Sequence, residues 1–127
     1  MQKNSLLNFQ GLDSLTQIGG LTVVESGITN FQGLESLTQI NPIAGNYNLL
    51  IDNNPNLLSL SGLDNLIFTQ TADINIGGSS GFSSGVGNPL LTDFCALQSS
   101  FLNSSSVIEN NAYNPTIQDI QNGNCSQ

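Results

Sequence analysis

The spacing of apolar residues between Leu15 and Leu37 restricts the fold of this chain more than any other feature. Neighbouring apolar residues there mostly lie three positions apart, but a step of two separates Leu21 from Val23. An amphipathic helix would keep steps of three and four, and a half-buried strand would keep steps of two. The mixture predicts a short strand that directs Leu21 and Val23 inward, then a corner and a loosely coiled return segment.

This unit recurs along the chain, with return segments that begin at Leu6, Ile28, Leu57 and Leu91, so that successive repeats are 22, 29 and 34 residues long. The inward strand pairs are Leu21/Val23, Leu49/Ile51, Ile74/Ile76 and Ser106/Ile108. A small polar residue follows each pair three positions later, and these predicted corner residues are Ser26, Asn54, Ser79 and Asn111. Such a pattern is typical of leucine-rich repeats.

We therefore expect an all-β chain, a parallel β-solenoid of about four coils with a C-terminal cap, forming a single domain over residues 1–127. The predicted coils cover residues 5–27, 28–56, 57–90 and 91–127. Their strands are expected at 21–25, 47–52, 72–76 and 107–109. Pro115 precedes a short predicted helix that Gly123 can end.

Two insertions account for the unequal repeat lengths, at 41–47 and 77–88, and the second is mostly Gly and Ser. Insertions in a solenoid leave one face of the stack, which is often the binding face. They can equally be tolerated surface loops without a partner.

The charge balance excludes several classes of function. The chain carries nine acids against one base, Lys3, and it has neither Arg nor His. One cation cannot displace the counterions of nucleic acid, and anionic membranes and phosphate ligands are disfavoured for the same reason. A Ser-His-Asp triad cannot be built, so we expect no enzyme and no cofactor. The longest apolar run is far too short for a membrane span.

Asp13, Glu35 and Asp64 occupy one position in three successive repeats. Since neighbouring coils lie about 4.8 Å apart, these carboxylates could form a cation-binding row. Alternatively, each acid begins a short helical turn, whose free N–H groups favour a negative charge. The absence of a Cys/His ligand set argues against structural zinc.

Cys95 and Cys125 are the only cysteines. An isolated pair in a chain of this composition predicts one disulfide, which would contribute roughly 3–4 kcal/mol in the chain-entropy model. The alternative is two buried free thiols in a reducing compartment. The start of the chain shows no apolar targeting segment, so we expect a fragment or a trimmed, exported form.

Two stretches resemble a known family. The phrases from Phe9 and Phe31, Phe-Gln-Gly-Leu-x-Ser-Leu-Thr-Gln-Ile, and the closing segment from Asn88 to Cys125 are similar to bacterial cell-surface proteins with receptor-L-domain-like leucine-rich repeats, common in Bacteroidetes. The resemblance implies a right-handed solenoid, export to the cell surface and a role in adhesion or recognition. It implies no catalytic residue, and the long Gly/Ser insertion departs from the family's usual coil length.

The expected function is thus non-enzymatic extracellular recognition of a protein or glycan. The expected surface combines outward strand residues with loop aromatics, because aromatic side chains on a rigid stack suit sugar rings and protein contacts. It comprises Thr22, Val24, Tyr47, Leu50, Asp52, Asn75 and Phe82. The alternative is a building unit of a larger surface assembly, which stacks on other copies through its uncapped N-terminal coil.

Overall fold

The computed structural model describes residues 7–41, 47–66, 73–80, 83–98 and 106–127. Strands predominate over helices, as the sequence predicts. The elements are β1 (Gln17–Ile18), β2 (Leu21–Val24), β3 (Gln39–Ile40), β4 (Leu49–Asp52), β5 (Ile74–Ile76), β6 (Ser79–Ser80), β7 (Ser83–Ser84), the 3₁₀ helix η1 (Cys95–Leu97), β8 (Val107–Ile108) and α1 (Ile117–Gln121).

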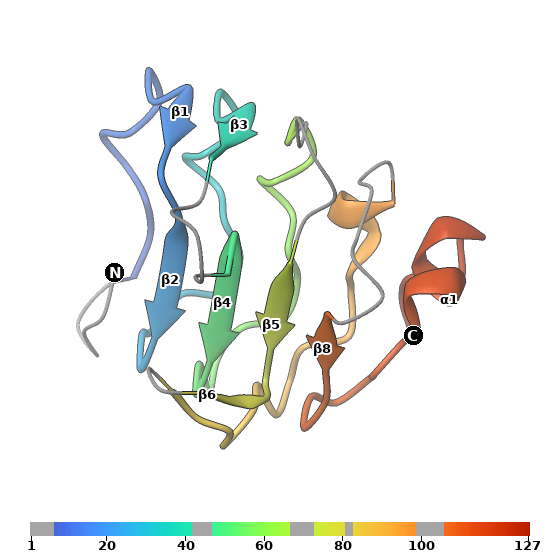
Figure 1. The fold of residues 1–127 in the computed structure, drawn as a ribbon. Helices are drawn as coiled ribbons and strands as arrows, with labels where there is room; N and C mark the ends of the chain where they lie inside the picture. Colours follow the sequence, from blue (N-terminus) through green and yellow to red (C-terminus); the bar gives the residue numbers. More distant parts are fainter. Residues whose placement is uncertain (1–6, 42–46, 67–72, 81–82, 99–105) are drawn as a thin grey trace.

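The main sheet is parallel, and its strand order β2-β4-β5-β8 follows the chain from the N-terminal to the C-terminal side (Figure 1). Leu21 pairs with Leu49, which pairs with Ile74, and Ile76 pairs with Ile108. The predicted alignment of these repeat positions is therefore confirmed. A second parallel pair, β1 with β3, was not expected from the sequence.

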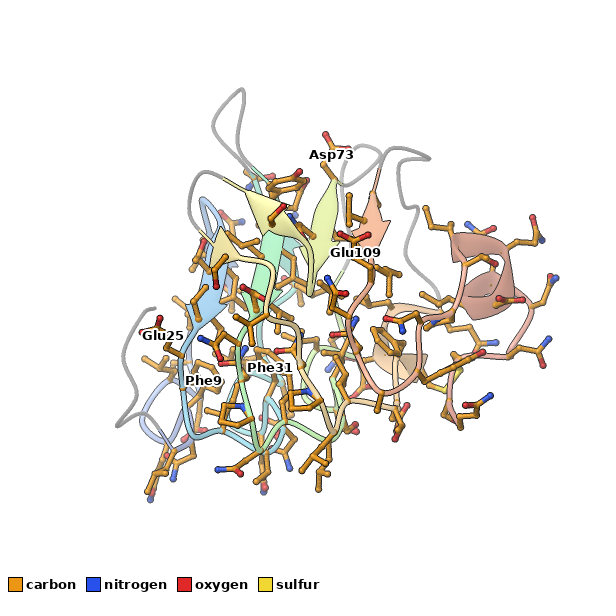
Figure 2. The ribbon with its side chains drawn as sticks, turned by 90° about the horizontal axis from the view of Figure 1, so that it is seen from below. Phe9, Glu25, Phe31, Asp73 and Glu109 are labelled. Atoms are coloured by element: carbon orange, nitrogen blue, oxygen red, sulfur yellow. A yellow bond between two sulfur atoms is a disulfide. The ribbon has the colours of Figure 1, made fainter. Side chains whose placement is uncertain are left out.

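Alternate strand residues and the return segments share one apolar core. Leu49, Ile51 and Ile76 are fully buried in it. On the return side Phe9 stacks on Phe31, with ring centroids 5.4 Å apart and planes 12° from parallel (Figure 2). Burial of each such side chain stabilises the fold by roughly 1.5–3 kcal/mol, so the core depends on both sides of every repeat.

A row of short polar side chains, the corner row, follows the strands and consists of Ser26, Asn54, Asn88 and Asn111. Each member donates its backbone N–H to the side-chain oxygen of the next, over 3.0, 3.1 and 3.3 Å. Asn54 and Asn88 are completely buried. The prediction of Ser79 as the third corner residue was wrong: the corner residue is Asn88, because the Gly/Ser insertion lies between the strand and its corner.

The insertion leaves and rejoins the repeat at one corner. The residue just before each corner residue has a positive φ: 56° at Glu25, 56° at Asn53, 89° at Gly87 and 62° at Asn110. At Gly87 a Cβ would clash with the Asn110 carbonyl oxygen, so only glycine fits. The chain thus departs after Gly77, whose N–H still donates to the Ile51 carbonyl, and recovers its repeat position at Gly87.

The outer face of the sheet differs from the prediction. Val24, Leu50, Asp52 and Asn75 were expected to face solvent, but their exposed fractions are 3%, 2%, 0% and 0%, and Val24 and Leu50 lie outside the inner core cluster. The segment following β5 bonds to two of them, and the Gly78 N–H donates to Asn75 Oδ1 over 2.9 Å. The Asp52 carboxylate accepts N–H bonds from Gly85 (3.0 Å) and Gly87 (2.7 Å).

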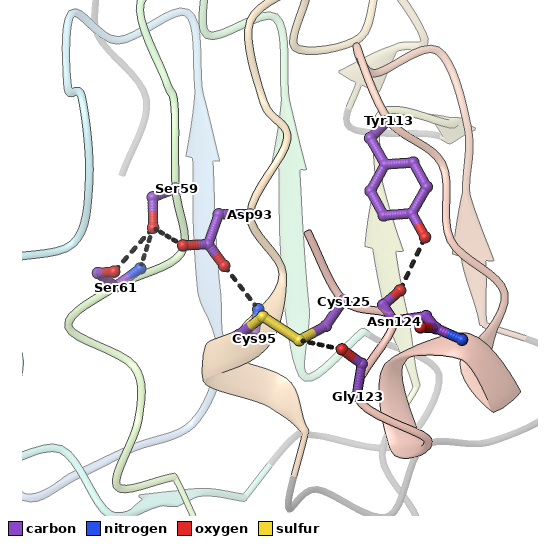
Figure 3. The surroundings of a disulfide bond; sticks show 8 residues. All are labelled: Ser59, Ser61, Asp93, Cys95, Tyr113, Gly123, Asn124 and Cys125. Atoms are coloured by element: carbon purple, nitrogen blue, oxygen red, sulfur yellow. Dashed lines mark hydrogen bonds between the residues drawn. A yellow bond between two sulfur atoms is a disulfide. The ribbon is translucent and has the colours of Figure 1, made fainter. Parts of the chain in front are cut away.

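The predicted disulfide between Cys95 and Cys125 is present and joins η1 to the last residues of the chain (Figure 3). The predicted short helix is also present as α1. Thr116 and Asp119 form a capping box at its start, and Gly123 follows it with a φ of 90°. The Tyr113 hydroxyl donates to the Asn124 carbonyl over 2.7 Å.

In the described residues, no helix combines the length and the apolar character that a membrane span requires.

Candidate functional site

The residues expected to bind a partner do not form one exposed surface. Thr22 is half-buried on β2, and Tyr47, just before β4, is also half-buried. The remaining strand residues, Val24, Leu50, Asp52 and Asn75, are buried. Phe82 lies outside the described residues. The sheet face therefore offers Thr22 and Tyr47 to a ligand, but not the continuous surface that the alternation of the strands predicts.

A groove with a different location lies between the return turns of the first two repeats. Its volume is about 540 Å³. We call it the amide groove; it is lined by Leu7, Asn8, Gln10, Asp13, Thr29, Asn30, Gln32, Gly33 and Glu35. Gln10 and Gln32 occupy the same position of successive repeats and are both exposed. Amides of two repeats therefore line one hollow.

Local hydrogen bonds orient the groove's side chains. Asn8 Oδ1 accepts the Gln10 N–H over 2.9 Å, and Asn30 Oδ1 accepts the Gln32 N–H over 2.8 Å. This is the Asx-turn geometry, in which the side chain replaces a backbone acceptor. Ser59 and Asp93 accept the N–H two residues later in the same way. These four residues, Asn8, Asn30, Ser59 and Asp93, form a second row, the turn row.

Two of the repeated acids also accept hydrogen bonds from backbone N–H groups of their own turns. A Glu35 oxygen accepts the Gly33 N–H over 2.7 Å, and an Asp64 oxygen accepts the Gly62 N–H over 3.2 Å. Each of these acids accepts from the residue two positions before it, and the turns are not the helical ones that were expected to begin at the acids. Asp13 and Glu35 line the groove whereas Asp64 does not. The described residues contain no group of three or more His, Cys, Asp or Glu side chains arranged for a metal ion.

The chemistry of the groove is neutral to acidic. Its carboxylates come without an Arg, Lys or His among the lining residues, so an anionic ligand would be repelled. Side-chain amides both donate and accept hydrogen bonds. Since the Asn oxygens are occupied by the turns, the Asn NH₂ groups and the Gln side chains remain for a ligand. A hydroxyl also both donates and accepts, which makes a polyhydroxyl ligand the best chemical match.

Of the groove residues, only Asp13 and Glu35 were singled out from the sequence, as members of a possible cation-binding row, and the amides were not identified. A signal was nevertheless present, because Asn-Phe-Gln occurs at 8–10 and again at 30–32. An exposed polar residue on either side of a buried one, repeated in adjacent coils, places paired polar groups side by side.

A second hollow, the C-terminal hollow, lies at the other end of the sheet. It measures about 600 Å³ and is lined by Ser106, Ile108, Asn114, Pro115, Thr116, Ile117, Gln118 and Gln121. The far edge of β8 borders it. Its lining is mixed, with the partly buried side chains of Ile108 and Ile117 beside exposed polar ones.

Comparison with known proteins returns no match to a protein-family profile, to a curated protein or to a solved structure.

Proposed function

We propose that the chain is an extracellular, non-enzymatic recognition module of the receptor-L-domain-like leucine-rich type, and that it binds a neutral glycan in the amide groove. The observation that carries this proposal is the groove itself, in which Asn8, Gln10, Asn30 and Gln32 from two successive repeats line one hollow without a cation. Protein partners of the same surface are the broader alternative.

A right-handed β-solenoid is the architecture that we assign to the repeats. Support comes from the register, in which Leu21, Leu49 and Ile74 align at equivalent repeat positions. Parallel strands in one sheet are joined by right-handed connections in about 98% of cases. The corner row, which bonds equivalent residues of neighbouring repeats, supports the same arrangement.

The use of the carboxylates favours binding over catalysis. Glu35, Asp52, Asp64, Asp93 and Asp119 each accept a backbone N–H. A catalytic pair of carboxylates must instead face a substrate. The disulfide and the predominance of uncharged polar residues favour an oxidising, extracellular setting.

The test is titration calorimetry with neutral oligosaccharides, using sulfated and sialylated ones as anionic controls. Gln10→Ala combined with Gln32→Ala removes two exposed amides without touching the turn bonds of Asn8 and Asn30. We expect about a tenfold loss of affinity, which is the effect of losing about 1.4 kcal/mol of hydrogen bonding. Gln121→Ala, an exposed amide of the C-terminal hollow, is the matched control and retains binding.

Equal binding by the double variant, or tighter binding of the anionic sugars, would remove the groove as the glycan site. A screen of neutral glycans without any ligand would remove the glycan proposal.

The building-unit alternative is favoured by one observation: among the described residues, β2 pairs on one side only, with β4. An unpaired strand edge is a template for another chain. Analytical ultracentrifugation separates the two proposals, since the assembly requires a sedimentation coefficient that rises with concentration, and a concentration-independent monomer contradicts it.

A further inference from the structure

The two sides of the repeats end differently at the C-terminus. On the return side, equivalent backbone N–H groups donate to the following repeat: Phe31 to Ser61, Leu60 to Asp93, and Phe94 to Cys125. The last acceptor comes from the C-terminal segment, and Ser126 forms an antiparallel bridge with Asp93. The final residues of the chain thus occupy the position that another return segment would take.

The corner row is closed at the same end. Asn114 Oδ1 accepts the N–H of Asn111 over 2.9 Å and its side-chain amide over 3.1 Å. These are the bonds that each earlier member makes to the next repeat. Asn114 therefore replaces the next corner residue.

The strand side remains open. The Ile51 carbonyl accepts the Gly77 N–H and the Ile76 carbonyl accepts the Glu109 N–H. Each also accepts a side-chain amide, from Asn88 and Asn111 respectively. Ile108 is next in this column by register, yet within the described part of the chain no donor to its carbonyl is recorded.

The direction of the β8 backbone follows from these bonds. Glu109 directs its N–H toward β5, and hydrogen bonding alternates along a strand, so the N–H and C=O of Ile108 point to the far edge. That edge borders the C-terminal hollow. Figure 1 shows α1 beyond β8, at the C-terminal end of the sheet.

We infer that the C-terminal hollow accepts one extended, basic peptide segment, which adds to the far edge of β8 as a fifth parallel strand. The peptide donates an N–H to the Ile108 carbonyl and accepts the Ile108 N–H. Such strand addition derives its affinity from main-chain bonds and its specificity from alternate side chains. One apolar side chain of the peptide packs against Ile108 and Ile117 in the hollow.

A second copy of the chain does not fit this position. A stacked repeat would need the return side as well, and residues 125–127 already fill the first place there through bonds to Phe94 and Thr92. A single strand requires only the open edge. The closed return side therefore selects a peptide segment over a whole repeat.

The charge of the peptide follows from the chain. Nine acids face one base overall, and the exposed Glu109 directly follows β8 (Figure 2). Asp119 lies on α1, whose Ile117, Gln118 and Gln121 line the hollow, and its carboxylate accepts the Thr116 N–H. Lysines flanking the apolar residue of the peptide are consequently attracted.

The experiment is fluorescence anisotropy with a labelled peptide of alternating lysine and valine, added to the full chain. Ile108→Pro removes an N–H that points to the far edge and leaves the β5–β8 bonds of Glu109 in place, as proline is tolerated on edge strands. We expect at least about a tenfold loss of affinity for Ile108→Pro and unchanged affinity for the matched control Ile108→Val. A peptide N-methylated at every residue, which cannot donate, does not bind the unmodified chain.

Because the N-methylated peptide is tested on the unmodified chain, its result does not depend on whether the Ile108→Pro variant folds. Binding of the N-methylated peptide, equal binding by Ile108→Pro, equal binding of a glutamate-valine peptide, or failure of the lysine-valine peptide to bind would each overturn the inference. None of these outcomes bears on the amide groove, which lies at the opposite end.

Discussion

The corner row and the turn row use the same kinds of short polar side chain for different tasks. The corner row is buried and bonds one repeat to the next, as Ser26 Oγ does to Asn54 Oδ1 over 2.6 Å. In the turn row each side chain accepts from a residue two positions later in its own repeat, and Ser59 also donates to Asp93 of the next repeat over 3.3 Å. Buried hydrogen bonds between repeats fix the register of the repeats. Local hydrogen bonds shape a turn, and water can replace them. The location of an asparagine therefore decides its energetic weight more than its identity does.

Asn54→Ala should produce the largest effect. It removes the acceptor of the Ser26 N–H and hydroxyl and the donor to the Val23 carbonyl, all of them buried. Since each buried group left without a partner costs roughly 1–3 kcal/mol, we expect the free energy of unfolding to fall by about 3–5 kcal/mol. Urea denaturation measures it, with the exposed Asn56→Ala as control. A loss no greater than that of the control would break the comparison.

Replacement of both cysteines by alanine should cost about 2–4 kcal/mol. The disulfide holds the segment whose Cys125 carbonyl ends the return side, while Asn114 ends the corner row independently. Hydrogen exchange should therefore lose protection at the Phe94 amide and retain it at Asn111. Equal loss at both amides would show that the two sides end as one unit.

Asn30→Ala should cost only about 0.5–1.5 kcal/mol, because it removes one part-exposed bond to the Gln32 N–H, which water can replace. Thermal unfolding beside Asn54→Ala gives the direct contrast between the rows. A cost equal to that of Asn54→Ala would show that side chains of the two rows contribute equally to stability.

The smallest expected effect is a change in the free energy of unfolding at low pH. The Thr116 N–H and hydroxyl lower the pKa of Asp119 below its ordinary value of 3.8. A carboxyl whose pKa is lower in the folded state adds stability above the unfolded pKa and loses it as the pH falls through the folded pKa. The stability difference between the unmodified chain and Asp119→Asn should thus shrink below about pH 4. A difference that grows with acidification would contradict the cause assigned.

The sequence predicted the features that repeat. Apolar pairs such as Leu21/Val23 identify strands because their period of two differs from the return spacing, and register follows from equivalence. The misplaced corner residue shows the limit of counting forward from a strand, since an insertion can lie before the corner. Counting backward would have found it: Asn54-Pro55 precedes Leu57 as Asn88-Pro89 precedes Leu91.

Burial of the outer face could not be read from alternation. Leu50 and Asp52 have the same period whether or not another segment covers them. Asp52 bonds to two glycines more than thirty positions later, and no local pattern announces such a contact. The amide groove depends likewise on two turns being adjacent.

The positive φ shared by Asn53, Gly87 and Asn110 has a consequence for engineering. Because the chain regains its repeat position at Gly87, the number of residues between Gly77 and Gly87 does not affect the alignment of the residues that follow. Foreign peptides could be grafted at this junction and displayed on a stiff support, provided that the graft keeps Gly77 and Gly87 and supplies the N–H donors to Asp52.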